Sequence, residues 1–132
     1  MADIVQMDSL DIDLLRRLSP GYVSNARYVV EKHESPTRTS IDLNLVQLAT
    51  PYVKQWEWSD DYAERYRSVV AKGTSFLASE HSTPIGIAIA EPQQWNQILN
   101  VCEIHVTEHA RRRGIGRLLM DKLSAVARER EL

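Results

Sequence analysis

The sequence predicts an α/β fold in which helices flank a mixed, mostly antiparallel central sheet. Three apolar segments in a row, 75–80, 85–91 and 98–107, are separated by short polar connections, as in an antiparallel sheet. Segments with helical signals precede these strands, and an amphipathic segment at 118–130 follows them. Helices beside a sheet in this order are typical of two-layer or three-layer α/β domains.

The N-terminal part of the chain predicts a strand and then a helix. Residues 10–18 mix apolar and charged side chains and predict a short opening strand. Ser19 and Pro20 then offer a helix N-cap and a proline at the first helical position. Pro36 lies just beyond the end of this predicted helix, whose apolar residues recur at helical spacing: Tyr22, Val23, Ala26, Val29 and Val30.

From residue 41 onward the pattern predicts a strand and a second helix. Residues 41–45 alternate apolar and polar side chains, which predicts a half-buried strand, and Pro51 interrupts the run after it. The acidic turn 59–61 caps the second helix, and Lys72 with Gly73 closes it. The apolar residues of this helix are Tyr62, Tyr66, Val69 and Val70.

The last third of the chain predicts a hairpin, a third strand and a closing helix. Residues 81–84 give a turn signal between the first two strands, and residues 92–97 connect to the third. The closing helix has an apolar face that we expect to be buried, made of Leu119, Leu123, Val126 and Ala127.

Length and composition fit a single domain, 1–132, that we expect in the cytoplasm. The hydrophobic fraction of 43% and the charged fraction of 26% are ordinary for a globular protein. A net charge of −2 argues against nucleic acid as a partner. The longest apolar stretch, 85–90, is too short to span a membrane, and the acidic segment 1–8 does not have the pattern of a signal peptide. Cys102 is the one cysteine, so we expect no internal disulfide.

The most informative segment is the loop between the last strand and the last helix. A chain that turns through glycines into a helix start presents several free backbone N–H groups in one direction, and the helix dipole adds partial positive charge. Arginines at that end oppose the dipole unless an anion offsets them. A solvated basic turn is the alternative. We expect a pyrophosphate site formed by Arg111, Arg112, Arg113, Gly114, Ile115, Gly116 and Arg117.

Two common phosphate loops do not match this segment. A dinucleotide-binding loop needs a third glycine or an alanine where this chain has Leu119. A P-loop needs Gly-Lys-Ser or Gly-Lys-Thr after a glycine and four residues, and the sequence has no such run. The loop instead reads R-x-x-G-x-G, directly after a strand that ends Ile104-His105-Val106.

This strand, loop and helix resemble motif A of the GCN5-related N-acetyltransferases over residues 100–127. The matching positions are Ile104, Val106, Arg111, Gly114, Gly116, Leu119 and Met120. The resemblance implies the acyl-CoA N-acyltransferase fold and a loop that cradles the pyrophosphate of acetyl-coenzyme A. It also implies that the backbone of Ile104, His105 and Val106 binds the acetyl carbonyl and pairs with pantetheine.

The resemblance implies transfer of an acetyl group to a primary amine, with no metal. For the general base, Glu103 is the first candidate, since the family often has a glutamate one position earlier, where this chain has Cys102. A β-bulge on this strand would correct that offset. His105 is the second candidate and Cys102, as a nucleophile, the third. Each of the three also has a purely structural interpretation within the sheet.

The acceptor is less well defined by the sequence. Trp56, Glu57 and Trp58, with the acids after them, offer cation–π and charge contacts to an amine, although packing of the tryptophans on the core is favoured. The chain also has a weaker similarity to streptothricin-type antibiotic acetyltransferases. The expected acceptor is a primary amine of a small molecule or a protein.

In the resembled family, further strands follow the motif A helix and complete the pantetheine cleft. On that basis we expect a sheet that lacks these C-terminal strands and a homo-oligomer formed through its open edge. Two alternatives stay open: a non-catalytic acyl-coenzyme A-binding module, and half of an assembly completed by another chain.

Overall fold

The computed structural model describes residues 2–132, which fold as two compact units. One unit comprises the chain up to Pro20 together with Glu57–Leu132, and the other comprises Gly21–Trp56. The first unit holds the sheet, the three α-helices and the glycine-rich loop. The second unit is a two-stranded hairpin.

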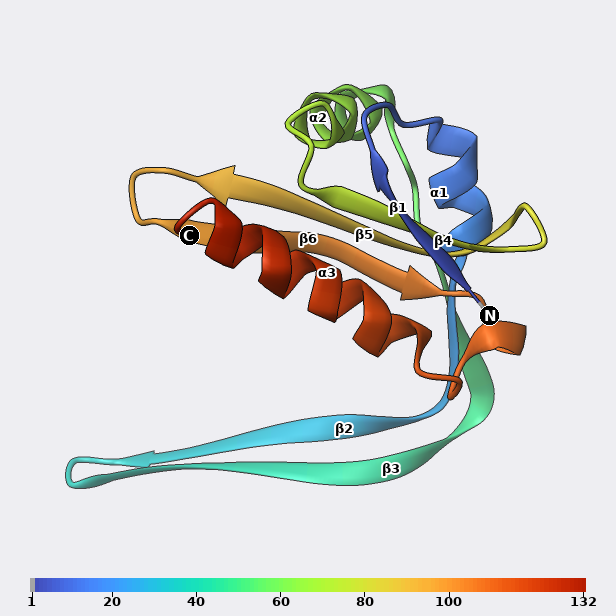
Figure 1. Ribbon diagram of the computed structural model, residues 1–132. Helices are drawn as coiled ribbons and strands as arrows, with labels where there is room; N and C mark the ends of the chain where they lie inside the picture. Colours follow the sequence, from blue (N-terminus) through green and yellow to red (C-terminus); the bar gives the residue numbers. More distant parts are fainter. Residues whose placement is uncertain (1) are drawn as a thin grey trace. The chain divides into compact units, whose positions relative to one another are not determined.

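The sheet of the first unit has four strands in the order β1-β4-β5-β6, and each neighbouring pair is antiparallel. The strands are β1 (Asp3–Met7), β4 (Ser75–Glu80), β5 (Thr83–Gln93) and β6 (Ile98–Val106). Helices α1 (Ile12–Leu18) and α2 (Asp60–Val70) cover one face, and α3 (Ile115–Glu129) covers the other (Figure 1). The predicted α/β fold with a mostly antiparallel sheet is therefore confirmed.

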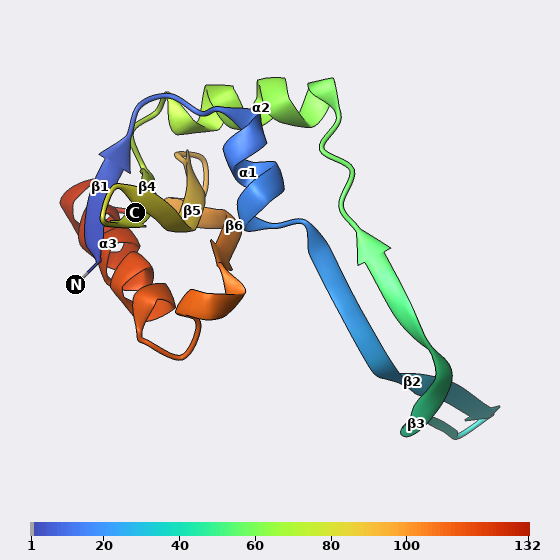
Figure 2. The same cartoon turned by 90° about the vertical axis from the view of Figure 1, so that its right-hand side faces the viewer.

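Each face of the sheet has its own hydrophobic core. Under α1 and α2, the buried set includes Leu15, Tyr66, Val69, Ile87 and Ile89. Under α3 it includes Phe76, Ala88, Ile115, Leu119 and Leu123. Figure 2, at right angles to the first view, shows the helices α1 and α2 on the opposite side of the sheet from α3. The sheet is thus the middle of three layers, and its last strand, β6, leads directly into the loop.

Residues 10–18 form a helix, so the predicted opening strand is wrong. The carboxylate of Asp11 accepts a hydrogen bond from the N–H of Asp13 at 3.0 Å and caps the helix. Every third residue from Ile12 to Leu18 is buried, which is the periodicity of a helix. The alternation of apolar and charged residues at the start of this segment is also typical of a strand. The capping Asp11 is the signal that distinguishes the helix from a strand.

Residues 21–35 form a strand, so the predicted helix there is also wrong. This strand, β2 (Gly21–Ser35), pairs antiparallel with β3 (Arg38–Gln55), and Pro36 and Thr37 form the turn between them. Valines and tyrosines favour strands once a partner supplies the backbone hydrogen bonds. The spacing of apolar residues within β2 alone is compatible with a helix, and only the pairing with β3 makes it a strand.

The strand predicted at 41–45 is confirmed and lies inside β3. The interruption predicted at Pro51 is also present, because the register passes from Ser24–Tyr52 to Ala26–Gln47 and leaves residues 48–51 outside the regular ladder. A proline is tolerated at such an irregularity since it has no N–H to donate.

The elements from residue 59 onward agree with the sequence prediction, with small shifts in their ends. Ser59 caps α2, accepting a hydrogen bond from the N–H of Tyr62 at 3.4 Å. His81 and Ser82 both have positive φ, as the tight turn between β4 and β5 requires. Helix α3 begins at Ile115, earlier than the predicted 118, so that the end of the loop forms its first turn. None of the helices among residues 2–132 is long and apolar enough to cross a membrane.

Gly86 sets how closely α3 approaches the sheet. A Cβ at this position would lie 3.2 Å from the carbonyl oxygen of His105, 3.3 Å from Ile115 Cγ2 and 3.4 Å from Leu119 Cδ1. We expect Gly86→Val to destabilise the fold by about 1–3 kcal/mol through overpacking, measured by urea unfolding. Gly116→Ala is the control, since its Cβ would meet Val106 Cγ2 at an ordinary 4.0 Å. Equal stability of the Gly86→Val protein and the wild type would contradict this close packing.

Candidate active site

The glycine-rich loop turns from β6 into α3 through two residues with left-handed backbone. Arg112 has φ of 63° and Gly114, the N-cap of α3, has φ of 84°. Because Gly114 has no side chain, it cannot cap the helix as serine or aspartate would. The N–H groups of Ile115, Gly116 and Arg117 stand in the first turn, where a helix offers them no acceptor. The loop therefore presents a row of backbone donors with a partial positive charge.

The glycine at position 116 is not required by the protein's own packing. A Cβ there would find space, with Val106 Cγ2 as its nearest neighbour at 4.0 Å. Glycine near the start of a helix also costs about 1 kcal/mol relative to alanine. A residue that costs stability and fills no steric need is what close approach of a ligand to the backbone would require.

The four arginines of the loop divide into two pairs. Arg111 donates from Nε to the carbonyl oxygen of Val106 at 3.0 Å, and Arg113 forms an ion pair with Glu80. These two arginines hold the loop against the ends of β6 and β4. Among residues 2–132, no hydrogen bond or ion pair engages the side chains of Arg112 and Arg117, which are both exposed. Within the described residues, Arg112 and Arg117 therefore have their whole guanidinium groups available to an anion.

A β-bulge in β6 places Cys102 and Glu103 on the same face of the sheet. The register passes from Ile89–Glu103 to Ala90–Val101, which leaves Cys102 as the extra residue. Cys102 packs against the core under α1 and α2, and Glu103 contacts Tyr66 of α2. In a regular strand, two successive side chains would point to opposite faces. The bulge that the sequence required for Glu103 is therefore present.

Glu103 is the centre of a small hydrogen-bonded cluster with Tyr66 and His105. The hydroxyl of Tyr66 donates to Glu103 Oε1 at 2.6 Å, and His105 Nε2 lies 2.7 Å from Glu103 Oε2. The side chains of His105 and Glu103 are 25% and 18% exposed, so solvent still reaches the cluster. Glu103 thus links His105 of β6 to Tyr66 of α2.

The cluster keeps Glu103 ionised. Burial alone would raise the pKa of Glu103, but the hydrogen bonds from His105 and Tyr66 and the nearby positive charges lower this pKa below its ordinary value. Burial, and then the hydrogen bond to Glu103, raise the pKa of Tyr66 far above its ordinary value, so Tyr66 stays protonated. At neutral pH the cluster thus holds a carboxylate that accepts two hydrogen bonds.

The contact between Tyr66 and Glu103 was not visible in the sequence. Tyr66 was expected only as an apolar residue of the second helix, and it is indeed buried there. The two residues are 37 positions apart, and nothing local to either one indicates the other. One acid, Glu103, and one base, His105, two residues apart on a strand were the sequence signal for this cluster.

We expect Tyr66→Phe to destabilise the fold by about 2 kcal/mol at pH 7, because a part-buried carboxylate loses a hydrogen bond. The loss should be smaller in strong acid than at pH 7, because Glu103 takes up a proton once the pH falls below its lowered pKa and then needs the bond less. Urea unfolding at both pH values measures the difference. Tyr62→Phe is the matched control, because Tyr62 is 49% exposed on the same helix. Equal losses in the two variants would contradict a role for the Tyr66 hydroxyl.

Cys102 does not have the environment of a nucleophile. Its thiol is half-buried, and burial, followed by the negative charge of Glu91, raises its pKa. Thiol reactivity depends on the thiolate form, which this environment disfavours. The structure therefore gives Cys102 a packing role.

The two tryptophans before α2 have different surroundings. Trp58 packs against the core under α1 and α2, and its Nε1 donates to the carbonyl oxygen of Ser19 at 3.3 Å. The expected packing of the tryptophans is thus confirmed for Trp58. Trp56 belongs to the hairpin unit and is 45% exposed, with Lys54 Nζ 5.5 Å from the centre of its ring.

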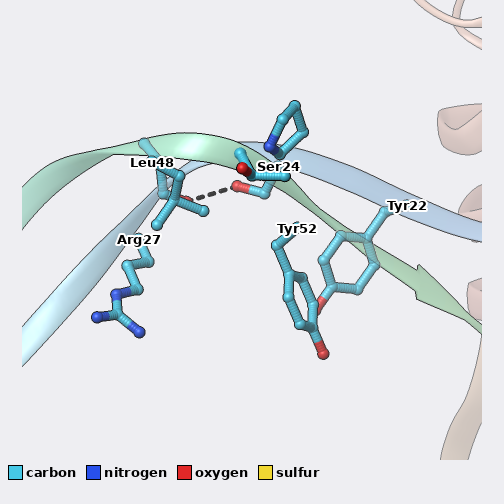
Figure 3. Close-up of a pocket in the computed structure, with 8 residues that line it drawn as sticks. Tyr22, Ser24, Arg27, Leu48 and Tyr52 are labelled. Atoms are coloured by element: carbon cyan, nitrogen blue, oxygen red, sulfur yellow. Dashed lines mark hydrogen bonds between the residues drawn. The ribbon is translucent and has the colours of Figure 1, made fainter.

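The hairpin contains a concavity of its own, of about 530 Å³, where residues 48–51 leave the regular ladder. Figure 3 shows the rings of Tyr22 and Tyr52 side by side on its wall, with Arg27 at the other end. The ring centroids are 6.1 Å apart. The guanidinium of Arg27 makes this surface a poor match for a cationic amine.

Comparison with known proteins identifies the strand, loop and helix. The sequence model of the acetyltransferase (GNAT) family matches residues 43–132, which is more than half of the chain. No curated protein sequence matches the chain at a significant level.

Two solved structures share the fold. A nourseothricin acetyltransferase superposes with a TM-score of 0.65 at 22% identity, over 98% of this chain and 68% of that one. A putative streptothricin acetyltransferase from Bacillus anthracis, in complex with acetyl coenzyme A, superposes with a TM-score of 0.60 at 19% identity, over 98% of this chain and 69% of that one. With the glycine-rich turn into α3 and the family match in agreement, the chain belongs to the acetyltransferase (GNAT) family.

Proposed function

We propose that this chain is an acetyl-coenzyme A-dependent N-acetyltransferase that acts in the cytoplasm on a primary amine of a small molecule or a protein. The observation that carries the proposal is the first turn of α3. Its uncapped N–H groups, the open backbone at Gly116 and the free side chains of Arg112 and Arg117 together fit a pyrophosphate. The acetyl-coenzyme A named with one of the structural neighbours supports the same ligand.

Residues 1–132 are proposed to work as one acetyltransferase domain. The family match begins at residue 43, inside the hairpin unit, and continues through the sheet unit to the end of α3. Both units are therefore included in the proposal.

The chemistry asks little of the protein. The amine nitrogen attacks the thioester carbonyl carbon, the carbon–sulfur bond breaks, the sulfur leaves with the bonding electrons, and the amine gives up a proton. The backbone of Ile104, His105 and Val106 is proposed to hold the acetyl and pantetheine groups as an added strand would be held. The ionised Glu103, directly or through a water molecule, is proposed to accept the proton. Arg111, Arg112, Arg113, Gly114, Ile115, Gly116 and Arg117 are proposed to form the pyrophosphate site.

Release of free thiol tests the proposal. The chain is incubated with acetyl-coenzyme A and, in separate reactions, with streptothricin, a lysine-containing peptide and a simple diamine, and acetylated product is identified by mass spectrometry. Thiol release that depends on the amine supports the enzyme. Binding of acetyl-coenzyme A without release for any amine would favour the alternative, a non-catalytic acyl-coenzyme A-binding module.

Self-association through β6 is proposed as well, because β6 is the last strand in the order of the described sheet. Val101 and Ile104 on this edge strand are 36% and 38% exposed. Exposed strand edges with apolar residues favour pairing between chains. We expect light scattering at micromolar concentration to show a dimer or larger species that Val101→Lys reduces. Val5→Lys, on the other edge strand, should have no such effect, and a monomeric wild type would contradict the proposal.

A further inference from the structure

Three side chains that can bind a metal ion gather near the tip of the hairpin. Glu31 lies directly opposite Asp42 in the register of β2 and β3, and His33 follows Glu31 by two residues. Because side chains alternate along a strand, all three project from one face of the ribbon. One possible ligand atom from each lies within 4.8 Å of the others. We call these residues the tip cluster.

The distances within the tip cluster fit donors around a common centre. His33 Nε2 lies 3.7 Å from Glu31 Oε2 and 3.7 Å from Asp42 Oδ2, which is too long for a hydrogen bond in either case. With metal–ligand bonds of about 2.0–2.2 Å, donors in a tetrahedral site stand roughly 3.4 Å apart. The three side chains are 56–63% exposed, so small rotations are enough to close the remaining few tenths of an ångström.

The charges of the tip cluster also favour a cation. Two carboxylates directly opposite each other on neighbouring strands repel. The nearby Lys32 projects from the other face of the ribbon, where it pairs with Glu34 at 2.8 Å. Within residues 2–132, the ion pairs recorded for Glu31 and Asp42 involve only His33. A divalent ion at the cluster would neutralise both carboxylates.

We propose that Glu31, His33 and Asp42 bind a divalent transition-metal ion of the Zn²⁺ type and clip the two strands of the hairpin together. One imidazole nitrogen with two carboxylate oxygens suits Zn²⁺ or a related ion, whereas Mg²⁺ and Ca²⁺ favour sites made of oxygen alone. Water would complete the coordination because the cluster is open to solvent.

The clip would act on the stability of the hairpin. A two-stranded ribbon on its own is only marginally stable in water. A bound ion that joins β2 to β3 at Glu31 and Asp42 would hold the register near the turn. An ion that binds only the closed ribbon multiplies its stability constant by 1 + [ion]/Kd, so hydrogen-exchange protection near the tip should rise about tenfold at an ion concentration ten times Kd.

Titration of the full chain with Zn²⁺ tests the proposal. Calorimetry measures the stoichiometry and affinity, and backbone NMR shifts locate the bound ion. We expect one ion per chain, shifts centred on residues 29–44, and affinity at least tenfold lower in His33→Ala and Asp42→Asn. His81→Ala is the matched control, since His81 is an exposed turn residue outside the cluster, and it should bind as the wild type does.

Three results would overturn the proposal: equal affinity of His33→Ala and wild type, equal competition by Mg²⁺, or shifts centred on residues 102–105. The last would place the ion at Cys102, Glu103 and His105 instead. Titration with Co²⁺ checks that case independently, because a thiolate ligand gives a charge-transfer absorption that the tip cluster cannot produce. All these readouts are independent of acetyl transfer.

Discussion

Gly116→Glu should abolish the thermal stabilisation of this chain by acetyl-coenzyme A and, in the absence of ligand, should stabilise the fold. Ligand binding to the folded state alone contributes about 2.7 kcal/mol at a concentration one hundred times Kd. A glutamate at this position places a carboxylate among the N–H groups proposed to hold the pyrophosphate. The same carboxylate is favourable for the helix, since an acid in the first turn complements the dipole and glutamate has the better helix propensity.

The two opposite effects make this variant decisive. Space for the new side chain exists, because a Cβ at Gly116 would meet its nearest neighbour, Val106 Cγ2, at 4.0 Å. Met120→Glu is the control, because it adds the same charge to α3 at a position that is 41% exposed. We expect that variant to keep the full ligand-induced shift in melting temperature. A full shift in Gly116→Glu as well would remove the loop from the binding site.

The part of the fold that the sequence predicted well is the part set by local signals. The N-cap at Ser59, the positive-φ turn at His81 and Ser82, and the glycine-rich turn at Gly114 each involve a few neighbouring residues. Such signals depend on backbone geometry that particular residue types adopt most easily. These local signals are enough to locate α2, the β4–β5 turn and the loop without knowledge of any tertiary contact.

The errors occurred where pairing or packing with another segment decides the structure. Spacing in residues 19–35 fitted a helix, but pairing with β3 supplies backbone hydrogen bonds that make it a strand. Residues 10–18 show the opposite error, since a strand was predicted and a helix is found. Their burial in the core under α1 and α2, which also contains Val69 and Ile87, follows helical spacing. Strand β1 (Asp3–Met7) was not predicted at all, and it is defined by its pairing with β4.

The candidate site shows the same division. The loop from Arg111 to Arg117 could be read from consecutive residues, whereas its internal contacts could not. Sequence alone gave the four arginines equal roles, but the ion pair of Arg113 with Glu80 joins residues 33 positions apart. The contact of Tyr66 with Glu103 is likewise a product of the tertiary fold.

Glu103→Gln should lower the turnover rate on the order of 100-fold and leave binding of acetyl-coenzyme A nearly unchanged, if Glu103 accepts the proton of the amine. Glutamine keeps the size of the side chain and can still accept a hydrogen bond from Tyr66, so the bulge and the core under α1 and α2 should stay intact. Melting temperature with and without ligand checks binding, and amine-dependent thiol release gives the rate. A rate within a few-fold of the wild type would leave Glu103 with a structural role.

His105→Gln is the variant that shows whether Glu103 or His105 accepts the proton of the amine. The carboxylate of Glu103 already accepts hydrogen bonds at 2.6 and 2.7 Å, and its lowered pKa makes it a weaker base than a free carboxylate. Histidine is the side chain that enzymes use most often as a general base. If Glu103 is the acceptor, His105→Gln should retain a rate within a few-fold of the wild type. A loss of about 100-fold in His105→Gln, with a smaller loss in Glu103→Gln, would instead make His105 the proton acceptor and Glu103 the group that orients it.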